Sequence, residues 1–177
     1  IPVTYREPDL TVTNIVLPAS SPGSGQMMTV NWTVENQGGR ETRRPIYYDR
    51  VYLSLDTSLD EDDQLLGQVR RNALVPAGSN YSESLDVRLP DGIEGDFFVL
   101  VFADSNIIGP KPPADPVVSL EDRLLAPDRP VDIVMARIEE FRDEGNNIAS
   151  EPLSITLSMA PDLQVTSVDA PTSTLIG

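Results

Sequence analysis

The chain consists of short stretches in which apolar and polar residues alternate, separated by residues that favour turns. Alternation with a period of two places every second side chain on the same face of a β-strand. The clearest case is residues 28–34, where one face is polar and the other apolar. The apolar face consists of Met28, Val30, Trp32 and Val34. We therefore expect half-buried strands, and no long helical period competes with them.

Seven segments have this strand character, and turn residues at 76–78 and 90–95 separate the later ones by lengths typical of antiparallel strands. Residues 65–69 suit an edge strand, whereas residues 97–102 are apolar throughout and suit a central strand buried on both faces. The segments are residues 10–15, 28–34, 51–55, 65–69, 81–89, 97–102 and 148–157. We predict an all-β chain folded as an antiparallel β-sandwich of about seven strands.

Residues 107–146 interrupt this rhythm before the last strand. The stretch is rich in proline, which lacks a backbone donor and disfavours the interiors of helices and strands. A capping signature at residues 119–122 allows a helical turn through Leu125, and residues 131–141 suit either a strand or a helix. The prolines are Pro110, Pro112, Pro113, Pro116, Pro127 and Pro130. We predict an inserted loop, for which a functional and a decorative role are equally compatible with the residues.

A segment of eleven residues occurs twice. Residues 8–18 read Pro-Asp-Leu-Thr-Val-Thr-Asn-Ile-Val-Leu-Pro and residues 161–171 read Pro-Asp-Leu-Gln-Val-Thr-Ser-Val-Asp-Ala-Pro, with six positions identical. A period of about 150 residues is too long for a solenoid and suits a string of globular domains. We expect a leader or linker at residues 1–7, one domain at residues 8–158, and a linker with the first strand of the next repeat at residues 159–177.

The composition excludes several classes of function. The chain has 28 acidic and 13 basic residues and a formal net charge of -15, a field that repels nucleic acid. Histidine and cysteine are absent from the sequence, which removes the usual general base, the thiol nucleophile and the common transition-metal ligands. It also contains no Gly-x-Ser-x-Gly elbow and no phosphate-binding glycine loop. We expect no enzymatic activity, no nucleic-acid partner and, because no apolar run could span a bilayer, no membrane insertion.

Short motifs follow one another along the chain in a recognisable order. Asn-Trp-Thr-Val-Glu-Asn-Gln-Gly at residues 31–38 precedes Asp-Arg-Val-Tyr-Leu-Ser-Leu-Asp at residues 49–56. The later motifs are residues 63–67, 89–95, 98–104 and 143–147. Together with the Pro-Asp-Leu segments at Pro8 and Pro161, this order resembles the CARDB family, the cell-adhesion-related domains found in bacteria. The resemblance covers the chain from Pro8 to Leu157, with the proline-rich insertion as its main departure.

The resemblance implies an immunoglobulin-like sandwich, tandem repetition, and a place on large secreted or surface-anchored bacterial proteins, with no enzyme activity. We therefore expect a non-catalytic structural or adhesive repeat module, located outside the cell or on the surface of a bacterium. The expected partners are neighbouring repeats of the same chain, and a surface glycan or protein is the candidate ligand. A start at Ile1 without a signal peptide suggests a piece of a longer protein. The family has no shared binding residue to carry over.

Residues 56–63 form the densest acidic stretch. Oxygen-bearing side chains alternate there, as they do at the start of a calcium loop. An EF-hand needs glycine at its sixth position and glutamate at its twelfth, whereas Glu61 and Gly67 stand there, so the motif is not an EF-hand. The candidate ligands are Asp56, Ser58, Asp60, Asp62 and Asp63. Two interpretations stay open: a calcium site completed by a neighbouring loop, and a solvated acidic turn.

The immunoglobulin-like order of strands predicts a second cluster of oxygen donors. In that order, the loop after the second strand and the loop before the last strand lie at the same end. The candidate metal ligands there are Asp49, Asp104, Asn106 and Asn147, with Glu35, Asp143 and Asn146 nearby. Alternatively, Asn146 and Asn147 form a turn with their own backbone, and Asp104 caps a strand. Calcium at either place would stiffen the module rather than catalyse a reaction.

The alternative function is that of a carbohydrate-binding accessory module of an extracellular enzyme, because β-sandwiches often bind sugars and aromatic side chains can stack on sugar rings. Trp32 falls on an apolar face and is expected in the core. Tyr47 and Tyr48, in the predicted loop before a strand, are the aromatic residues expected to be free for a ligand. The same loop carries basic residues that could pair with the acidic end of the module, namely Arg40, Arg43 and Arg44.

Overall fold

The computed structural model describes residues 6–60, 62–106, 135–136, 138, 145–158, 166–167 and 169. The strands in these ranges are β1 (Leu10–Val16), β2 (Met27–Asn36), β3 (Ile46–Ser54), β4 (Gln64–Asn72), β5 (Asn80–Arg88), β6 (Gly95–Asn106), β7 (Met135–Ala136) and β8 (Ile148–Ile155). The same ranges contain no helix that is long and apolar enough to cross a membrane. The prediction of an all-β fold is confirmed for the described residues.

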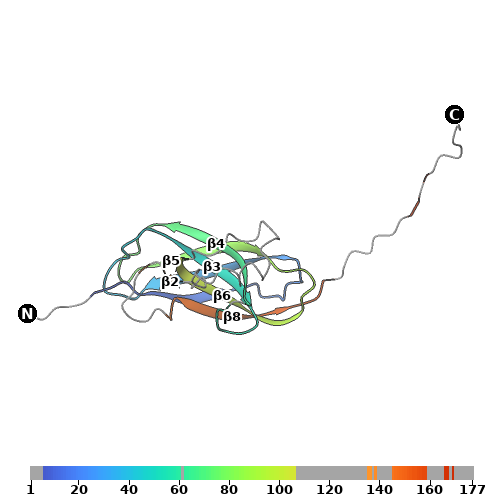
Figure 1. Cartoon of the computed structure of the whole chain (residues 1–177), viewed down its shortest axis with the longest axis horizontal. Helices are drawn as coiled ribbons and strands as arrows, with labels where there is room; N and C mark the ends of the chain where they lie inside the picture. The colour runs from blue at the N-terminus through green and yellow to red at the C-terminus, as the bar shows by residue number, and fades with distance from the viewer. Residues whose placement is uncertain are drawn as a thin grey trace, which may run out of the picture.

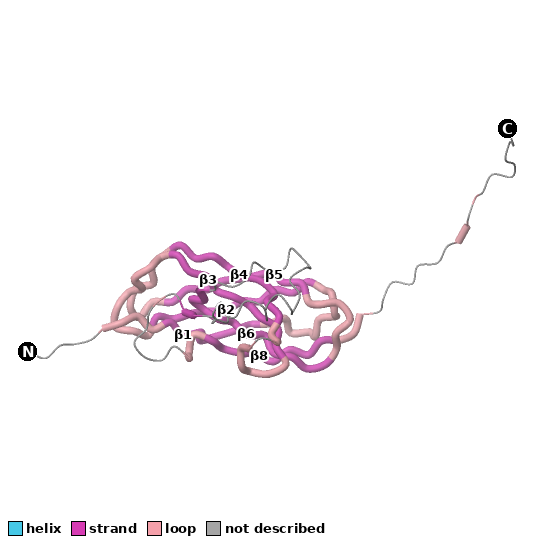
Figure 2. The backbone as a smooth tube through the Cα atoms, viewed as in Figure 1, coloured by secondary structure: helices cyan, strands magenta, loops and turns pink. Residues whose placement is uncertain are grey.

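The strands form two antiparallel sheets that pack face to face (Figures 1 and 2). The smaller sheet has the order β1-β2-β5. In the larger sheet the order is β4-β3-β6, and the far side of β6 pairs with β8 over residues 95–102 and with the short β7 at its end. Seven longer strands in two sheets match the predicted antiparallel β-sandwich, which is therefore confirmed.

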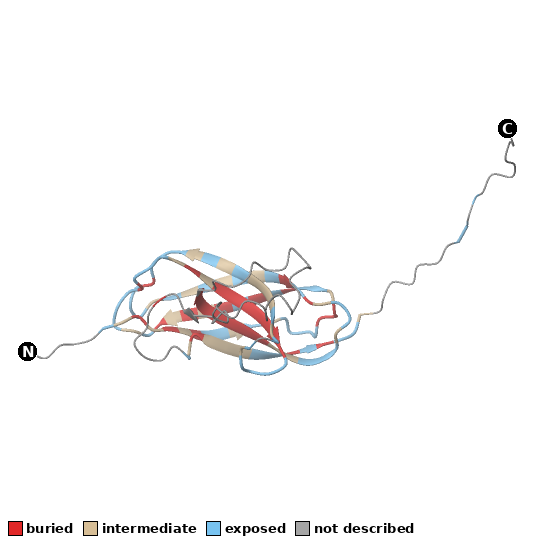
Figure 3. Ribbon diagram, viewed as in Figure 1, coloured by how far each residue is buried: buried red, intermediate tan, exposed pale blue. Residues whose placement is uncertain are grey.

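The core lies between the two sheets (Figure 3). Trp32 of β2 is fully buried, and so are Val30 and Val34 on the same face of that strand. They belong to one apolar cluster with Val51 of β3 and Val101 of β6. Removing apolar surface from water contributes about 25 cal/mol per Å², so this face is what holds the smaller sheet against the larger one. The predicted core position of Trp32 is confirmed.

β6 is buried on both of its faces from Val99 to Phe102, whereas Phe97 and Phe98, at the start of the predicted segment, are half buried. Val101 belongs to the main core, whereas Leu100 packs with Tyr52 on the outer face of the larger sheet. Leu59, in the loop between β3 and β4, packs against the same outer cluster. One apolar side chain thus anchors a loop that is otherwise rich in aspartate.

β1 and β8 run side by side in the same direction, so the described chain begins at one end of the sandwich and leaves it at the other (Figure 1). Near the start of β1, Asn146 Nδ2 donates to Asp9 Oδ1 at 2.9 Å. Beyond the end of β1, the Thr156 N–H donates to the carbonyl of Pro22 at 3.0 Å. We define the N-terminal end by residues 6–9, 37–45 and 145–147, and the C-terminal end by residues 17–26, 55–60 and 156–158.

β3 begins at Ile46, five residues before the predicted start at Val51. Tyr47 is therefore a strand residue with no exposed surface, and the prediction that it is free for a ligand is wrong. Tyr48 points to the opposite face of the sheet and is half buried. The charged pair that follows these tyrosines made the segment look like a loop, but Asp49 is fully buried in the strand.

Most of the predicted insertion lies outside the described residues, namely residues 107–134, 137 and 139–144. Met135 and Ala136 form β7 opposite the end of β6, so the strand alternative holds for these two residues. The second copy of the repeated segment falls on residues of which only three are described. The domain boundaries proposed from the sequence therefore stay predictions.

Candidate functional site

The acidic loop, residues 55–63, connects β3 to β4 at the C-terminal end and is largely exposed. Its carboxylates accept hydrogen bonds from the loop's own backbone: Asp56 Oδ1 from the N–H of Ser58 at 2.7 Å, and Asp60 Oδ1 from the N–H of Asp62 at 2.9 Å. Asp63 Oδ2 accepts from the N–H of Asp60 at 2.8 Å. These bonds define the turns of the loop, as a solvated acidic turn requires.

The described carboxylates of this loop are not gathered around a common point. In the part of the chain that the structure describes, no three acidic side chains are close enough together to hold a metal ion. The calcium site at Asp56, Ser58, Asp60, Asp62 and Asp63 stays a prediction.

The second predicted cluster is partly brought together at the N-terminal end. Asp49 of β3 and Asp104 of β6 are both fully buried, and the Asp104 N–H donates to Asp49 Oδ1 at 3.2 Å. Asp104 adopts the left-handed backbone conformation, with φ of 56°, and its Oδ2 accepts from the N–H of Ile138. Asn147 is also buried, and its carbonyl accepts from the N–H of Ala103 at 2.9 Å.

Other residues predicted in this cluster are Asn106, Asp143 and Asn146. Asn106 ends β6, and its side chain lies outside the described residues, as does Asp143. The side chain of Asn146 reaches β1, where it donates to Asp9 and to Thr11 Oγ1 at 3.0 Å. These two bonds join Asn146 to the start of β1. As a metal site, the set Asp49, Asp104, Asn106 and Asn147 stays a prediction.

The carboxylate of Asp49 accepts hydrogen bonds from several strands in the core. Trp32 Nε1, from β2, donates to its Oδ2 at 3.0 Å, and Tyr81 OH, from β5, donates to its Oδ1 at 3.1 Å. Burial raises the pKa of Asp49 to about 6, against the opposing effect of the hydrogen bonds from Trp32, Asp104 and Tyr81. The three donors come from β2, β5 and β6, so Asp49 links the smaller sheet to the larger one.

Arg71 of β4 extends this polar network towards the open side of the sandwich. Its guanidinium carbon lies 3.5 Å from the centre of the Tyr81 ring, and its Nε donates to Tyr47 OH at 3.2 Å. An ion pair joins it to Glu83. Burial raises the pKa of Tyr47 to about 12, although the nearby Arg71 acts in the opposite direction. Tyr47 and Tyr81 are thus held by protein partners, and neither offers a free ring face to a sugar.

Sequence reasoning did not identify Arg71, because its partners come from both sheets, Tyr47 from the larger sheet and Tyr81 and Glu83 from the smaller one. The loop arginines that it did identify lie at the N-terminal end. Arg43 pairs there with Glu7, while Arg40 and Arg44 are exposed. The predicted ion pairing of this basic group is thus seen for Arg43, with an acidic residue of the same end.

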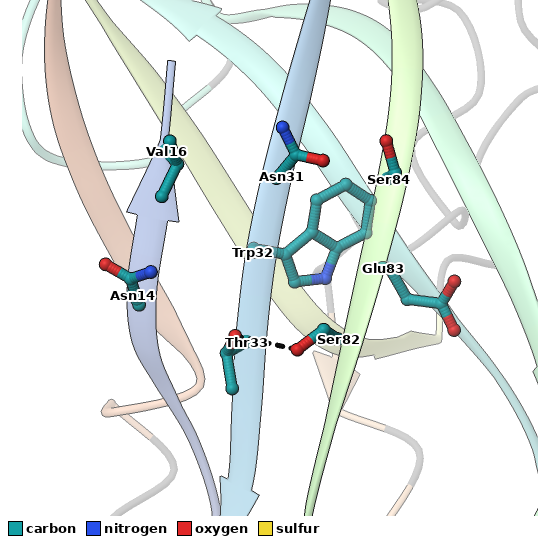
Figure 4. Close-up of a pocket in the computed structure, with 8 residues that line it drawn as sticks. All are labelled: Asn14, Val16, Asn31, Trp32, Thr33, Ser82, Glu83 and Ser84. Carbon is teal, nitrogen blue, oxygen red and sulfur yellow. Dashed lines mark hydrogen bonds between the residues drawn. The ribbon is translucent and has the colours of Figure 1, made fainter.

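A shallow hollow of about 490 Å³ lies over the smaller sheet (Figure 4). Short polar side chains of β1, β2 and β5 form its floor, and Thr33 Oγ1 and Ser82 Oγ bond to each other there at 2.9 Å. The residues that line it are Asn14, Val16, Asn31, Trp32, Thr33, Ser82, Glu83 and Ser84. The alternation of the sequence predicted the polar face of residues 28–34. It did not predict that this face lines a hollow together with residues of two other strands.

No family model and no curated protein matches the chain. Among solved structures, the crystal structure of the CARDB domain of the PF1109 protein from Pyrococcus furiosus, in complex with di-metal ions, matches with a TM-score of 0.51 and 18% sequence identity. The match covers 88% of this chain and 100% of that chain. The solution structure of the same domain also matches with a TM-score of 0.51. The fold of the chain is that of a CARDB domain, as the sequence resemblance implied.

Enzymes also occur among the similar structures, at lower similarity. A β-glucosidase from Listeria innocua, in complex with glucose, matches with a TM-score of 0.41 and 11% identity. The match covers 86% of this chain but 16% of the enzyme. A score this low says nothing about the activity of the chain.

Proposed function

We propose that the chain is a non-catalytic structural and adhesive module of a large secreted or surface-anchored bacterial protein, in which it links its neighbours end to end. The CARDB fold supports a role in adhesion, since the family takes its name from that role. The absence of histidine and cysteine from the sequence supports a role without catalysis.

The observation that carries the proposal is the position of the two ends of the described chain. Arg6 lies before β1 at the N-terminal end, and Ser158 lies after β8 at the C-terminal end. A second Pro-Asp-Leu segment begins at Pro161, six residues after β8 ends at Ile155. Six extended residues span at most about 20 Å, so a following module would start close to the C-terminal end of this one. Modules joined in this way form a string.

A fragment of the parent protein that contains two consecutive modules tests this arrangement. Small-angle X-ray scattering should give a maximum dimension about twice that of one module, because each module adds its long axis to the string. The single chain measured under the same conditions is the control. A compact two-module particle, no longer than one module, would contradict the end-to-end arrangement.

Calcium is the proposed stiffening ion, held by the acidic loop. The CARDB domain of Pyrococcus furiosus was solved as a complex with di-metal ions, which supports metal binding as a property worth testing in this fold. The loop supplies only carboxylate, hydroxyl and carbonyl oxygens, which are the ligands that calcium prefers. Because Leu59 anchors the loop on the larger sheet, an ion bound there would brace β3 and β4.

A carbohydrate-binding accessory module of an extracellular enzyme is the second candidate function. The hollow over the smaller sheet favours it, whereas the burial of Tyr47 removes one of the aromatic rings expected to be free for a sugar. A catalytic domain next to this module in the parent protein would favour this candidate. Further copies of the same module would favour the first one.

A further inference from the structure

The hollow over the smaller sheet is nearly free of charge, although the chain is strongly acidic. Among the described residues that line it, only Glu83 is charged, and it is paired with Arg71. The remaining polar lining consists of amide and hydroxyl side chains. An anionic ligand would be repelled by the net charge of -15, and a cationic one would find no free carboxylate in the hollow. The charge distribution therefore fits a neutral ligand.

The lining side chains form two neighbouring rows across the sheet. Asn31 of β2 lies between Val16 of β1 and Ser84 of β5, and the next row contains Asn14, Thr33 and Ser82. Thr33 and Ser82 bond to each other. In contrast, the side chains of Asn14, Asn31 and Ser84 form no hydrogen bond with another residue that the structure describes.

Three polar side chains with free donors and acceptors thus project from adjacent strands into one hollow (Figure 4). Each asparagine amide offers two N–H groups and a carbonyl oxygen, and the serine hydroxyl can donate and accept. Neighbouring strands lie about 4.8 Å apart, so the groups can reach one ligand together. Val16 adds an apolar contact at the edge, where 49% of its surface is exposed.

The backbone of β2, at the centre of this surface, is not available to a partner. β2 is paired along both of its edges, with β1 on one side and β5 on the other. A peptide that adds to a sheet needs a free strand edge, because its affinity comes from main-chain hydrogen bonds. A ligand over β2 must instead be recognised through side chains alone, which suits the many hydroxyl groups of a sugar chain.

We propose that the outer face of the smaller sheet binds a neutral polysaccharide displayed on a surface. The hollow is open and crosses three strands, so it fits a stretch of glycan chain rather than a single enclosed sugar. Asn14, Asn31 and Ser84 donate and accept hydrogen bonds to the hydroxyl groups, and Val16 contacts the apolar face of a sugar ring. The proposal rests on the proposed adhesive function, to which it gives a class of ligand.

Binding of the whole chain to an array of neutral and charged glycans tests this assignment, followed by calorimetry with the strongest neutral polysaccharide. Binding to neutral polysaccharides is expected, with little change between low and high salt because no charge is involved. Binding only to charged glycans, binding only to free monosaccharides, or no binding to any glycan would each overturn it.

Substitutions locate the binding face. Asn31→Ala and Asn14→Ala should each weaken binding about five- to tenfold, as expected for loss of one or two hydrogen bonds. Asn72→Ala, an exposed asparagine of β4 in the other sheet, is the matched control and should bind as the unchanged chain does. Ser84→Ala provides a third, smaller change on the same face. Binding unaffected by all three lining substitutions would overturn the proposal.

The glycan-binding test and the test of the proposed function can fail independently of each other. Thermal melting of each variant shows that the fold is intact, since these side chains are exposed and make no hydrogen bond with the described residues. The scattering experiment on two consecutive modules does not depend on the hollow. An extended string that binds no glycan would retain the structural role and reject this ligand.

Discussion

Asp49 shows how one buried carboxylate makes the stability of the module depend on pH. Its ordinary pKa is 3.8, and burial raises it to about 6 in the folded chain. Between these values the folded chain binds the proton more tightly than the unfolded chain does. The contribution of Asp49 to stability is therefore greatest below about pH 4, decreases as the pH rises through 6, and is constant above that.

The free energy of unfolding should accordingly fall between pH 4 and pH 6. Two pKa units correspond to about 3 kcal/mol for this one group. Urea denaturation at a series of pH values measures the slope, and Asp49→Asn should flatten it because asparagine does not titrate. At low pH the variant should also be less stable than the unchanged chain. Both carboxylate oxygens of Asp49 accept hydrogen bonds, so the amide N–H₂ that replaces one of them would face a hydrogen-bond donor. An unchanged slope in the variant would show that other groups cause the pH dependence.

Arg71 provides a second test at the scale of one residue. Arg71→Ala removes a stacked guanidinium from Tyr81, a donor from Tyr47 and the partner of Glu83. We expect a loss of about 2 kcal/mol in the free energy of unfolding, measured by urea denaturation. Arg70→Ala is the matched control, because Arg70 is exposed on the same strand and should change stability by less than about 0.5 kcal/mol. Equal effects of the two substitutions would contradict the assigned role.

Single residues were predictable when one strand determined their position. The alternation around Trp32 sufficed to place it in the core, because side chains two apart share a face. Tyr47 was misplaced, because its hydroxyl is paired with Arg71, a polar partner that only the pairing of β3 with β4 brings to it. The order of strands predicted that Asp49 and Asp104 lie close together. It did not predict that Trp32 and Tyr81 donate hydrogen bonds to Asp49.

The acidic loop is the element on which the calcium prediction depends. Addition of calcium should raise the midpoint of thermal unfolding by several degrees relative to the chain in a chelator, because an ion that binds only the folded state stabilises it. The double substitution Asp60→Asn and Asp62→Asn should abolish that difference. Asp91→Asn, an exposed carboxylate outside the loop, serves as the control. Identical melting curves with calcium and with the chelator would end the calcium hypothesis.

Elements with regular alternation were predicted closely, and elements with charged interiors were not. The predicted segment at residues 81–89 corresponds to β5 at Asn80–Arg88, because turn residues mark both of its ends. β3 was predicted too short, since Asp49 and Arg50 are charged and their buried partners are distant in sequence. Leu55, predicted as the end of the same strand, lies outside it and is 75% exposed.

At the scale of the whole molecule, the two-sheet architecture followed from the number and spacing of the strands. The pairing of β6 with β3 on one side and β8 on the other joins segments about 50 residues apart, so it could be expected only from the immunoglobulin-like order that the resemblance implied. The large connection between β6 and β8 still permits this pairing. Loop length costs little in closure entropy, so a long insertion is compatible with a regular sheet around it.

The parallel course of β1 and β8 determines how the module would respond to a pulling force. Tension applied through the two ends of the described chain draws β1 towards the N-terminal end and β8 towards the C-terminal end. The contacts between them are then loaded in shear, including the bond from the Val12 N–H to the Asn146 carbonyl and that from the Thr156 N–H to the Pro22 carbonyl. Bonds loaded in this way bear the force together rather than opening one after another. Under such a load the sandwich would hold its length until it yields as a unit.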